Sequence, residues 1–297
     1  MINFVNLMEG RSLGILEDDQ DMDEYWYSDN WIMEPISVGV RIQCHVDENE
    51  ALGFLGKRKD YKRKETIYQL TEIIKDIKDC KLPKNTLFEG YITFDNDQQK
   101  VYKFLKSETL EDDCKNATFY VTDLMYLDDQ PVFDMPLFDR RSKLKSLITE
   151  SKTLKLQTGY TTRKKNVYLD MKDKFKVFIF KDLESIYTFN QSMFWRILKT
   201  PQSFFMSIMG FVESDDEKFR NMVMALKGGQ IKDGMMTKIM NIPVHSNDNR
   251  IFLNNSKSEI LGKVFEILAL EKTKEGKYSE ARFLKLRNDK ALEDCIF

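Results

Sequence analysis

Alternating apolar and polar residues predict most of the strands in the first two thirds of the chain. Ile42, Cys44 and Val46 alternate with polar residues, so we expect one strand over residues 33–45, with residues 51–55 as its hairpin partner. Polar turn residues separate the other apolar stretches. The further strands expected here cover residues 86–94, 101–105, 118–126, 155–157, 167–170, 175–180 and 194–198.

Two stretches have the period of an amphipathic helix instead. In a helix over residues 65–78, one face would be apolar and formed by Ile67, Leu70, Ile73, Ile74 and Ile77. Residues 137–150 turn a second face inward, formed by Leu144, Leu147 and Ile148. Residues 1–30 show neither period and are expected to be an irregular, acidic lead-in.

The pattern changes near Pro201. From there the apolar stretches are short and are separated by glycine and asparagine pairs, which indicates a small β-barrel. The strands expected in it cover residues 204–211, 221–226, 235–242, 264–270 and 283–286. We therefore predict two domains, over residues 1–200 and 201–297.

Composition supports a globular protein without a membrane segment. The chain has 297 residues, 42% of them hydrophobic, which suffices for a core. No apolar run approaches the roughly 20 residues that a membrane span needs, and we see no basic-then-apolar leader. Four widely spaced cysteines indicate unpaired thiols in a reducing cytosol, and two histidines make a zinc site improbable. We expect a cytoplasmic protein.

The overall charge does not indicate a nucleic-acid-binding protein, because 46 lysines and arginines against 48 aspartates and glutamates leave a formal net charge of only −2. Residues 16–30 are strongly acidic. A basic run follows at Lys57, Arg58, Lys59, Lys62, Arg63 and Lys64. Such a run is either a solvated face or a surface that contacts phosphates, and the sequence favours neither.

One stretch, residues 31–43, carries the frame Glu-x-x-x-x-Gly-x-Arg at Glu34, Gly39 and Arg41. It resembles the adenylation signature Glu-x-Lys-x-Asp-Gly-x-Arg of ATP-dependent DNA ligases, with Ile36 at the lysine and Val38 at the aspartate. Further segments resemble ligase motifs in the same order. They are 55–61 (LGKRKDY), 89–91 (EGY), 122–129 (TDLMYLDD), 136–141 (PLFDRR), 181–187 (KDLESIY), 195–199 (WRILK) and 282–290 (RFLKLRNDK).

The chain is thus similar to a minimal, phage-type ATP-dependent DNA ligase over nearly its whole length. The resemblance implies an α+β fold. A ligase-type nucleotidyltransferase domain of antiparallel sheets flanked by helices would be followed by a C-terminal OB-fold barrel. Fold alone does not establish activity, so the residues that carry the chemistry decide the function.

Several of those residues are missing. In the family, a lysine amine attacks the α-phosphate of ATP, whereas Ile36 has no nucleophilic atom. Positions that hold Mg²⁺ through carboxylates correspond to Val38, Tyr91 and Lys176, and the ring that stacks on adenine corresponds to Thr122. We expect no catalytic residue, no metal, no cofactor and no ATP binding.

Positive charge persists at other family positions, namely Lys181, Lys199, Arg282, Arg287 and Lys290. Together with the basic run, these residues form the expected nucleic-acid-binding set. For Arg287, a plain ion pair with Asp289 on the barrel surface is an equal alternative. Trp195, Tyr187 and Tyr126 are expected to be core aromatics rather than base-stacking ones.

Three functions remain open. The leading hypothesis is an inactive ligase-like protein of DNA replication or repair that binds duplex or nicked DNA, in the bacterial cytosol if a phage encodes it. The second is a working ligase or nucleotidyltransferase with a relocated lysine, such as Lys176 or Lys181. The third is a protein-binding adaptor or inhibitor of a DNA-processing or defence complex.

Overall fold

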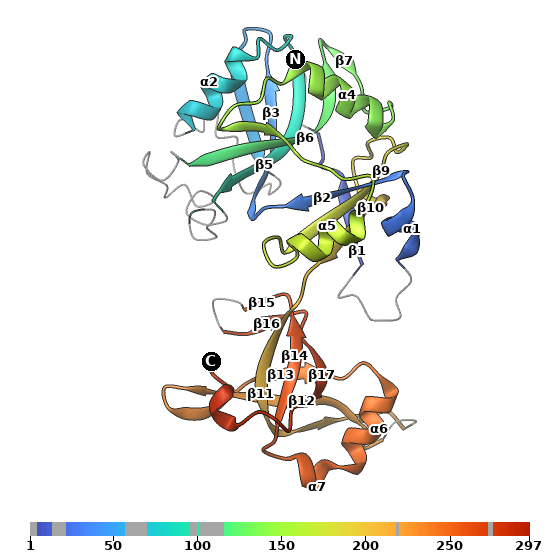
Figure 1. Ribbon diagram of the computed structural model, residues 1–297, viewed down its shortest axis with the longest axis vertical. Helices are drawn as coiled ribbons and strands as arrows, with labels where there is room; N and C mark the ends of the chain where they lie inside the picture. Colours follow the sequence, from blue (N-terminus) through green and yellow to red (C-terminus); the bar gives the residue numbers. More distant parts are fainter. Residues whose placement is uncertain are drawn as a thin grey trace. The chain divides into compact units, whose positions relative to one another are not determined.

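The computed structural model describes residues 5–13, 22–56, 70–95, 100, 116–217, 220–272 and 276–297. The chain divides into two compact units, Met1–Lys199 and Thr200–Phe297 (Figure 1). Within the described ranges, no helix has the length and apolar character required to cross a membrane.

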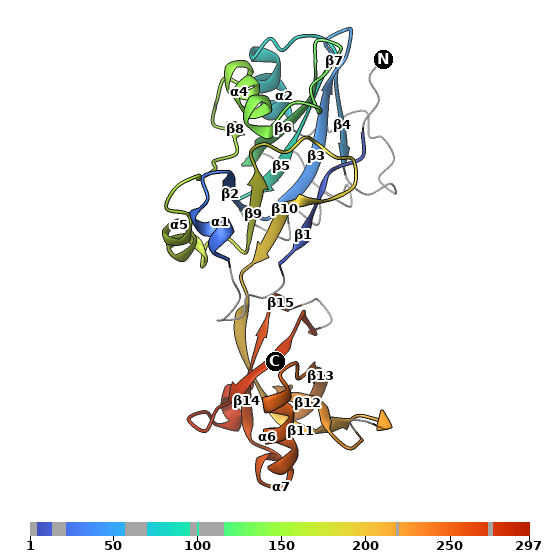
Figure 2. The same cartoon turned by 90° about the vertical axis from the view of Figure 1, so that its right-hand side faces the viewer.

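The described residues of the first unit form two sheets. One sheet has the strand order β1-β10-β9-β2, and β1 lies parallel to β10 along its edge (Figure 2). Its strands are β1 (Glu9–Ser12), β2 (Trp31–Ile36), β9 (Val177–Asp182) and β10 (Gln191–Lys199).

The other sheet of the first unit has the order β4-β3-β5-β6-β7, with β8 added in parallel to β6. Its strands are β3 (Gly39–Val46), β4 (Leu52–Gly56), β5 (Thr86–Phe94), β6 (Ala117–Leu127), β7 (Gln130–Pro131) and β8 (Leu154–Leu156). Gly90 sits where β5 and β6 approach most closely, since a Cβ there would lie 2.1 Å from the carbonyl oxygen of Tyr120. Gly90 therefore allows the close approach of the two strands.

Helices α2 (Thr71–Asp79) and α4 (Leu137–Leu147) cover one face of this sheet (Figure 1). Ile73 and Leu144 pack with Ile42, Cys44 and Phe88 in the main core. The described residues of the unit also form helices α1 (Asp23–Tyr27) and α5 (Lys164–Met171). The opposite face of β3 is also covered, because Gln43 is only 1% exposed. The covering elements on that side form the candidate site.

The second unit is an OB-type barrel around a five-stranded sheet of order β13-β12-β11-β14-β17. Met206, Leu226, Leu253 and Phe265 are buried in its core. Its strands are β11 (Gln202–Glu213), β12 (Val223–Lys232), β13 (Met235–Pro243), β14 (Val264–Ala269), β15 (Glu271–Lys272), β16 (Tyr278–Ser279) and β17 (Arg282–Leu286). Its helices are α6 (Asn247–Asn255), α7 (Lys257–Ile260) and the short 3-10 helix η3 (Leu292–Asp294).

Most expected strands are present, but the single strand over residues 33–45 is wrong. The chain bends at Ser37 and Val38, so that β2 pairs with β9 whereas β3 pairs with β4 and β5. Close approach between Gly39 and Ile92 fixes where β3 begins, because a Cβ on Gly39 would lie 2.5 Å from the Ile92 carbonyl oxygen. The stretch therefore joins two sheets.

The strand expected over residues 167–170 is also wrong, because these residues lie in α5. Val167, Tyr168 and Met171 recur with helical spacing and pack together against Trp26 and its neighbours. Four residues are too few to separate the two periods.

Three further expectations need correction. Residues 1–30 are more regular than expected, since they contain β1 and α1. Helices α6 and α7 interrupt the barrel where no helix was expected, although the Ser246 hydroxyl caps α6 by accepting from Asn249 N–H at 3.4 Å. Helix α4 ends at Leu147, before residue 150. The expected strand 101–105 and helix residues 65–69 lie outside the described residues.

Candidate functional site

Ile36, at the position of the family's nucleophile, ends strand β2 and is 7% exposed. Its direct partner across the β2–β9 pair is Val177, at the position of a family glycine. Two alkyl side chains therefore face each other where the resemblance places the reacting amine and the close backbone approach. This pair has no group that could attack a phosphate.

An apolar cluster surrounds this pair. Its buried members are Met8, Ile36, Leu87, Met125, Ile179, Tyr187 and Trp195, and Tyr91, Val177 and Ile197 pack against them. Ile197 stands at the first lysine of the Trp-x-Lys-x-Lys motif that residues 195–199 resemble. Four substituted family positions thus fall in one cluster, namely Ile36, Tyr91, Val177 and Ile197. The substitutions are mutually consistent, because each contributes apolar surface to the same core.

Three other substituted positions, Thr122, Val38 and Lys176, are buried or partly buried in the same unit. Thr122 on β6 is 1% exposed, and its hydroxyl donates to the Glu89 carbonyl at 3.3 Å. Val38 packs against the main core of the unit. Lys176 lies half-buried directly before β9.

Glu34 is the first of two buried carboxylates beside the cluster. It is fully buried, forms an ion pair with Arg141, and lies 2.8 Å from the ammonium of Lys181. The contact with Lys181 is electrostatic and lacks the geometry of a hydrogen bond. The pair with Glu34 ties Arg141 on α4 to β2. Arg141 also donates to the carbonyl of Gln157, just after β8, at 2.9 Å.

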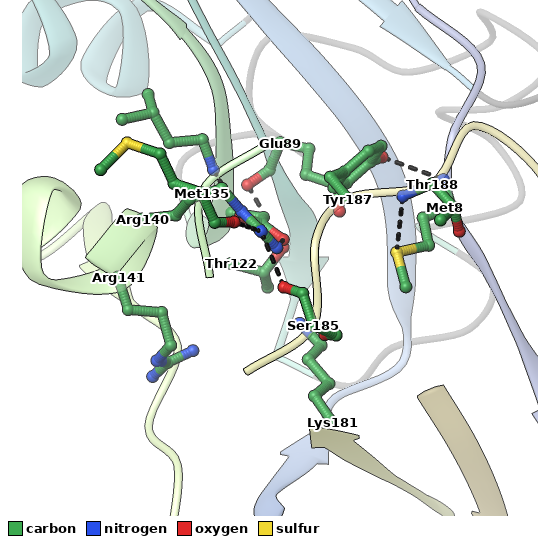
Figure 3. Close-up of polar contacts among 12 residues, drawn as sticks. Met8, Glu89, Thr122, Met135, Arg140, Arg141, Lys181, Ser185, Tyr187 and Thr188 are labelled. Atoms are coloured by element: carbon green, nitrogen blue, oxygen red, sulfur yellow. Dashed lines mark hydrogen bonds and ion pairs between the residues drawn. The ribbon is translucent and has the colours of Figure 1, made fainter. Parts of the chain in front are cut away.

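Glu89 is the second buried carboxylate. It accepts from Arg41 at 2.6 Å. It also accepts from the Tyr187 hydroxyl at 2.9 Å (Figure 3). Burial alone would lower the pKa of Arg41, but the charge and hydrogen bond of Glu89, together with the electrostatic contributions of Tyr91 and Tyr187, raise that pKa above its ordinary value. Burial raises the pKa of Tyr187 well above its ordinary value. Both groups therefore keep one charge state at neutral pH.

The Trp195 ring contacts two cations of this network. The Lys181 ammonium is 4.1 Å and the Arg41 guanidinium 5.2 Å from its ring centroid. Cation–π contacts in such desolvated places are worth up to about 2 kcal/mol. Trp195 and Tyr187 are each 2% exposed, which confirms that they are core aromatics. Tyr126 is partly buried and packs against the same cluster.

Tyr91 stands at the position of a metal-binding acid. Its Cα is opposite Arg41 across β3 and β5, and its hydroxyl is buried although part of the residue is accessible. Burial raises the pKa of Tyr91 to about 12. The hydroxyl is therefore neutral at physiological pH and does not replace a carboxylate as a Mg²⁺ ligand. Among the described residues, no three His, Cys, Asp or Glu side chains converge as a metal site would require.

A third buried pair anchors the site from behind. Arg140 and Asp123 are both fully buried and form a bidentate pair at 2.7 and 2.9 Å. Arg140 also donates to the carbonyls of Met135 at 2.6 Å and Ser185 at 3.1 Å (Figure 3). With its donors paired in this way, the guanidinium fixes α4 and the 183–190 segment to β6.

The residues expected to bind nucleic acid differ in burial and in their place in the fold. Lys181 is 1% exposed, so an external phosphate would have to displace Glu34 to reach it. Lys199 ends β10 and Arg282 begins β17. The basic run of Lys57, Arg58, Lys59, Lys62, Arg63 and Lys64 lies outside the described residues.

Arg287 and Lys290 lie together just after β17. Arg287 pairs with Glu266 at 2.8 Å and with Asp289 at 2.6 Å, and the hydrogen bonds that it donates to Asp289 and Glu266 raise its pKa. The same bond from Arg287 lowers the pKa of Asp289. Both cations lie 5.0 Å from the ring of Phe205. The surface pair with Asp289 is present, and it leaves the cations at the surface of the barrel.

Sequence analysis missed the segment that covers the site, residues 5–13. Met8 in this segment is fully buried in the apolar cluster, and Gln43 on β3 binds the segment's main chain. The only sequence signal is Gly10 between two charged residues. It is weak, because the stretch has no strand or helix period.

The geometry defines a class of protein: a nucleotidyltransferase-type domain followed by an OB-fold domain. The ligase domain of LigD from M. tuberculosis has this fold, with a TM-score of 0.51, 16% identity, and 99% of this chain and 98% of that chain covered. A Lig E DNA ligase has the same fold, with a TM-score of 0.54 and 13% identity, and the match covers 94% of this chain and 99% of that chain. Pmar-Lig has a TM-score of 0.57 and 16% identity, and the match covers 94% of this chain and 68% of that chain.

The family model for the ATP dependent DNA ligase domain matches residues 24–195, more than half of the 297 residues. The chain therefore belongs to the ATP-dependent DNA ligase family. No curated protein is significantly similar to it in sequence.

Proposed function

We propose that this protein is a catalytically inactive member of the ATP-dependent DNA ligase family that binds duplex or nicked DNA. One observation carries the proposal: Ile36 pairs with Val177 across two strands, within an apolar cluster at the position of the reaction centre. The fold of the family is retained, and apolar side chains that pack together occupy positions where the family has reactive groups.

This cluster lacks the chemical groups that adenylation requires. The first step needs a nucleophilic amine, and Mg²⁺-assisted phosphoryl transfer needs carboxylates on the metal. A nucleotide at this position would also have to displace the side chains of Met8 and Tyr91. Opening a packed core of this kind costs several kcal/mol per large side chain, so tight ATP binding is not expected.

A relocated lysine is the alternative that keeps activity. Lys181 is one candidate, but Glu34 lies 2.8 Å from its ammonium and the Trp195 ring centroid lies 4.1 Å from it. A nucleophile must instead be free, uncharged and in line with the α-phosphate. The position of Lys181 thus favours a structural role.

DNA binding needs only positive charge on an accessible surface. Arg282, Arg287 and Lys290 follow one another along β17 and the loop after it, and Lys199 and the basic run add to the set. Lig E DNA ligases, described as binding DNA with a minimal scaffold, share this fold. Unpaired thiols at Cys44, Cys80 and Cys295 agree with a reducing cytosol, bacterial if a phage encodes the protein.

The test combines binding and chemistry in one reaction. Labelled nicked duplex and a matched intact duplex are incubated with the protein, ATP and Mg²⁺ between about 50 and 200 mM salt. The proposal expects both duplexes to shift in a gel, more weakly as salt rises, and the nick to stay open. Sealing of the nick contradicts it. Absence of any shift at the lowest salt favours a role directed at a protein partner, as an adaptor or inhibitor.

A further inference from the structure

The segment from Val5 to Leu13 is held by side chains of distant elements. The Val5 N–H donates to the Gln43 side chain at 3.1 Å, and the same side chain donates back to the Val5 carbonyl at 2.9 Å. The Met8 N–H donates to the Tyr187 hydroxyl at 2.9 Å, and the Met8 carbonyl accepts from Arg41 at 2.5 Å. Four main-chain groups are thus satisfied without a neighbouring strand.

Met8 is the side-chain anchor of this segment. It is fully buried in the cluster that contains Ile36 and Trp195. Its sulfur lies 3.4 Å from the Thr188 N–H, which donates to it. The unbranched thioether suits an irregular space of this kind.

Gly10 sets how closely the segment approaches the sheet. A Cβ at this position would lie 2.9 Å from Ile197 Cγ1 and 3.2 Å from Trp195 Cβ. Beyond Gly10 the segment runs parallel to β10, and the Leu13 N–H donates to the Ile197 carbonyl at 2.8 Å. A larger residue at Gly10 would push the strand off its partner.

Main-chain bonds to side chains, one buried anchor and addition to a sheet edge are the means by which proteins bind an extended peptide. We infer that Arg41, Gln43, Tyr187, Trp195 and Ile197 form a peptide-binding surface, which takes an extended segment with a methionine two residues before a glycine. Its occupant is the chain's own segment, residues 5–13. This binding site is a property of the first unit and holds whether or not the protein binds DNA.

Cutting the full-length protein between the segment and Met22 tests the inference. A site-specific protease sequence replaces part of residues 14–20, and the cut protein is passed over a gel-filtration column. The fragment is expected to remain bound and to exchange with a labelled synthetic peptide of residues 1–13. Loss of the fragment on the column, with or without precipitation of the remaining chain, overturns the inference.

Peptide variants show whether the contacts above are responsible. A peptide with Met8→Ala is expected to bind at least about tenfold more weakly, because a buried anchor is removed. A peptide with Gly10→Val is expected not to enter, whereas the control Asn6→Ser, at an exposed position, binds within about twofold of the native sequence. Equal binding of all three variants contradicts the inference.

The uncut chain gives an independent readout. With Gly10→Val in the full-length protein, hydrogen exchange should accelerate at Met8 and Leu13, whose amides lose their acceptors. Amides of α2 and α4 should keep their protection, because they pack on the far face of the other sheet. Unchanged exchange at Met8 and Leu13 overturns the inference.

Discussion

The ammonium of Lys181 lies 2.8 Å from the carboxylate of Glu34, and both side chains are closed off from solvent. Glu34 also pairs with Arg141, so one carboxylate joins β2, β9 and α4. Lys181 is buried and Arg141 is partly exposed, so loss of the acid would leave a buried ammonium without a partner. A lysine at a family position is therefore part of the interior of the domain.

Replacing Glu34 should be more damaging than replacing Lys181. Glu34→Gln is expected to lower the free energy of unfolding by about 3–5 kcal/mol, since it strands a buried ammonium. Lys181→Met should cost less, because Glu34 keeps Arg141. Urea unfolding of both variants and of the double variant measures the coupling, expected at about 0.5–3 kcal/mol.

The matched control for this comparison is Lys145→Met, on the exposed side of α4. Its free energy of unfolding should stay within about 0.5 kcal/mol of the native protein. Additive effects of the Glu34 and Lys181 substitutions would contradict the pairing.

Restoring a lysine at the family position should not restore activity. Ile36→Lys is expected to form no AMP adduct, because Tyr91 and Thr122 still occupy the places of a metal ligand and of the stacking ring. It should also lower the free energy of unfolding by at least about 3 kcal/mol, since an ammonium would be buried in an apolar cluster. Ile36→Val, as the control, should cost about 0.5–1.5 kcal/mol. AMP on the introduced lysine would contradict the account.

Stability should fall in alkali in a way that depends on Tyr91. Burial raises the pKa of Tyr91 from 10.0 to about 12, so the unfolded chain loses this proton first as the pH rises. The contribution is complete below pH 10 and is lost between about pH 10 and 12. At pH 11 the native protein should have lost about 1.4 kcal/mol more than Tyr91→Phe, measured by urea unfolding at a series of pH values. Parallel curves for the two proteins would disprove the burial of this hydroxyl.

DNA affinity should depend on cations of the barrel. Arg282→Gln and Lys290→Gln are each expected to weaken binding to any duplex and to reduce the slope of log K against log salt by about 1, as the loss of one phosphate contact requires. Lys145→Gln, on α4 of the other unit, should change neither quantity. Fluorescence anisotropy at several salt concentrations gives both values, and unchanged slopes would remove these residues from the proposed surface.

Local patterns predicted much of the fold, because many strands alternate or lie between clear turn residues. The hairpin of β3 and β4 and the long strand β6 follow from such patterns. The ordered series of motifs predicted the family as well, and the substitutions at Ile36 and Tyr91 were visible in it. What could not be seen was that these substituted positions pack into a single cluster.

The missed features depend on contacts between distant residues. Met8 is buried by Tyr187 and Trp195, which are nearly two hundred positions away, so no local period marks it. Val167 and Leu169 alternate like a strand, yet packing of the neighbouring Tyr168 against Trp26 at 5.3 Å is made by a helix. Burial of Lys181 was equally invisible, because its partner Glu34 belongs to another strand.

Intact-mass spectrometry of the full-length protein tests the central claim most directly. The protein is measured as purified, after pyrophosphate treatment, and after incubation with excess ATP and Mg²⁺. With Ile36 in place of the nucleophile, the mass is predicted to be that of the unmodified chain in all three samples. A gain of one AMP per chain that pyrophosphate removes and that maps to any lysine would contradict the account.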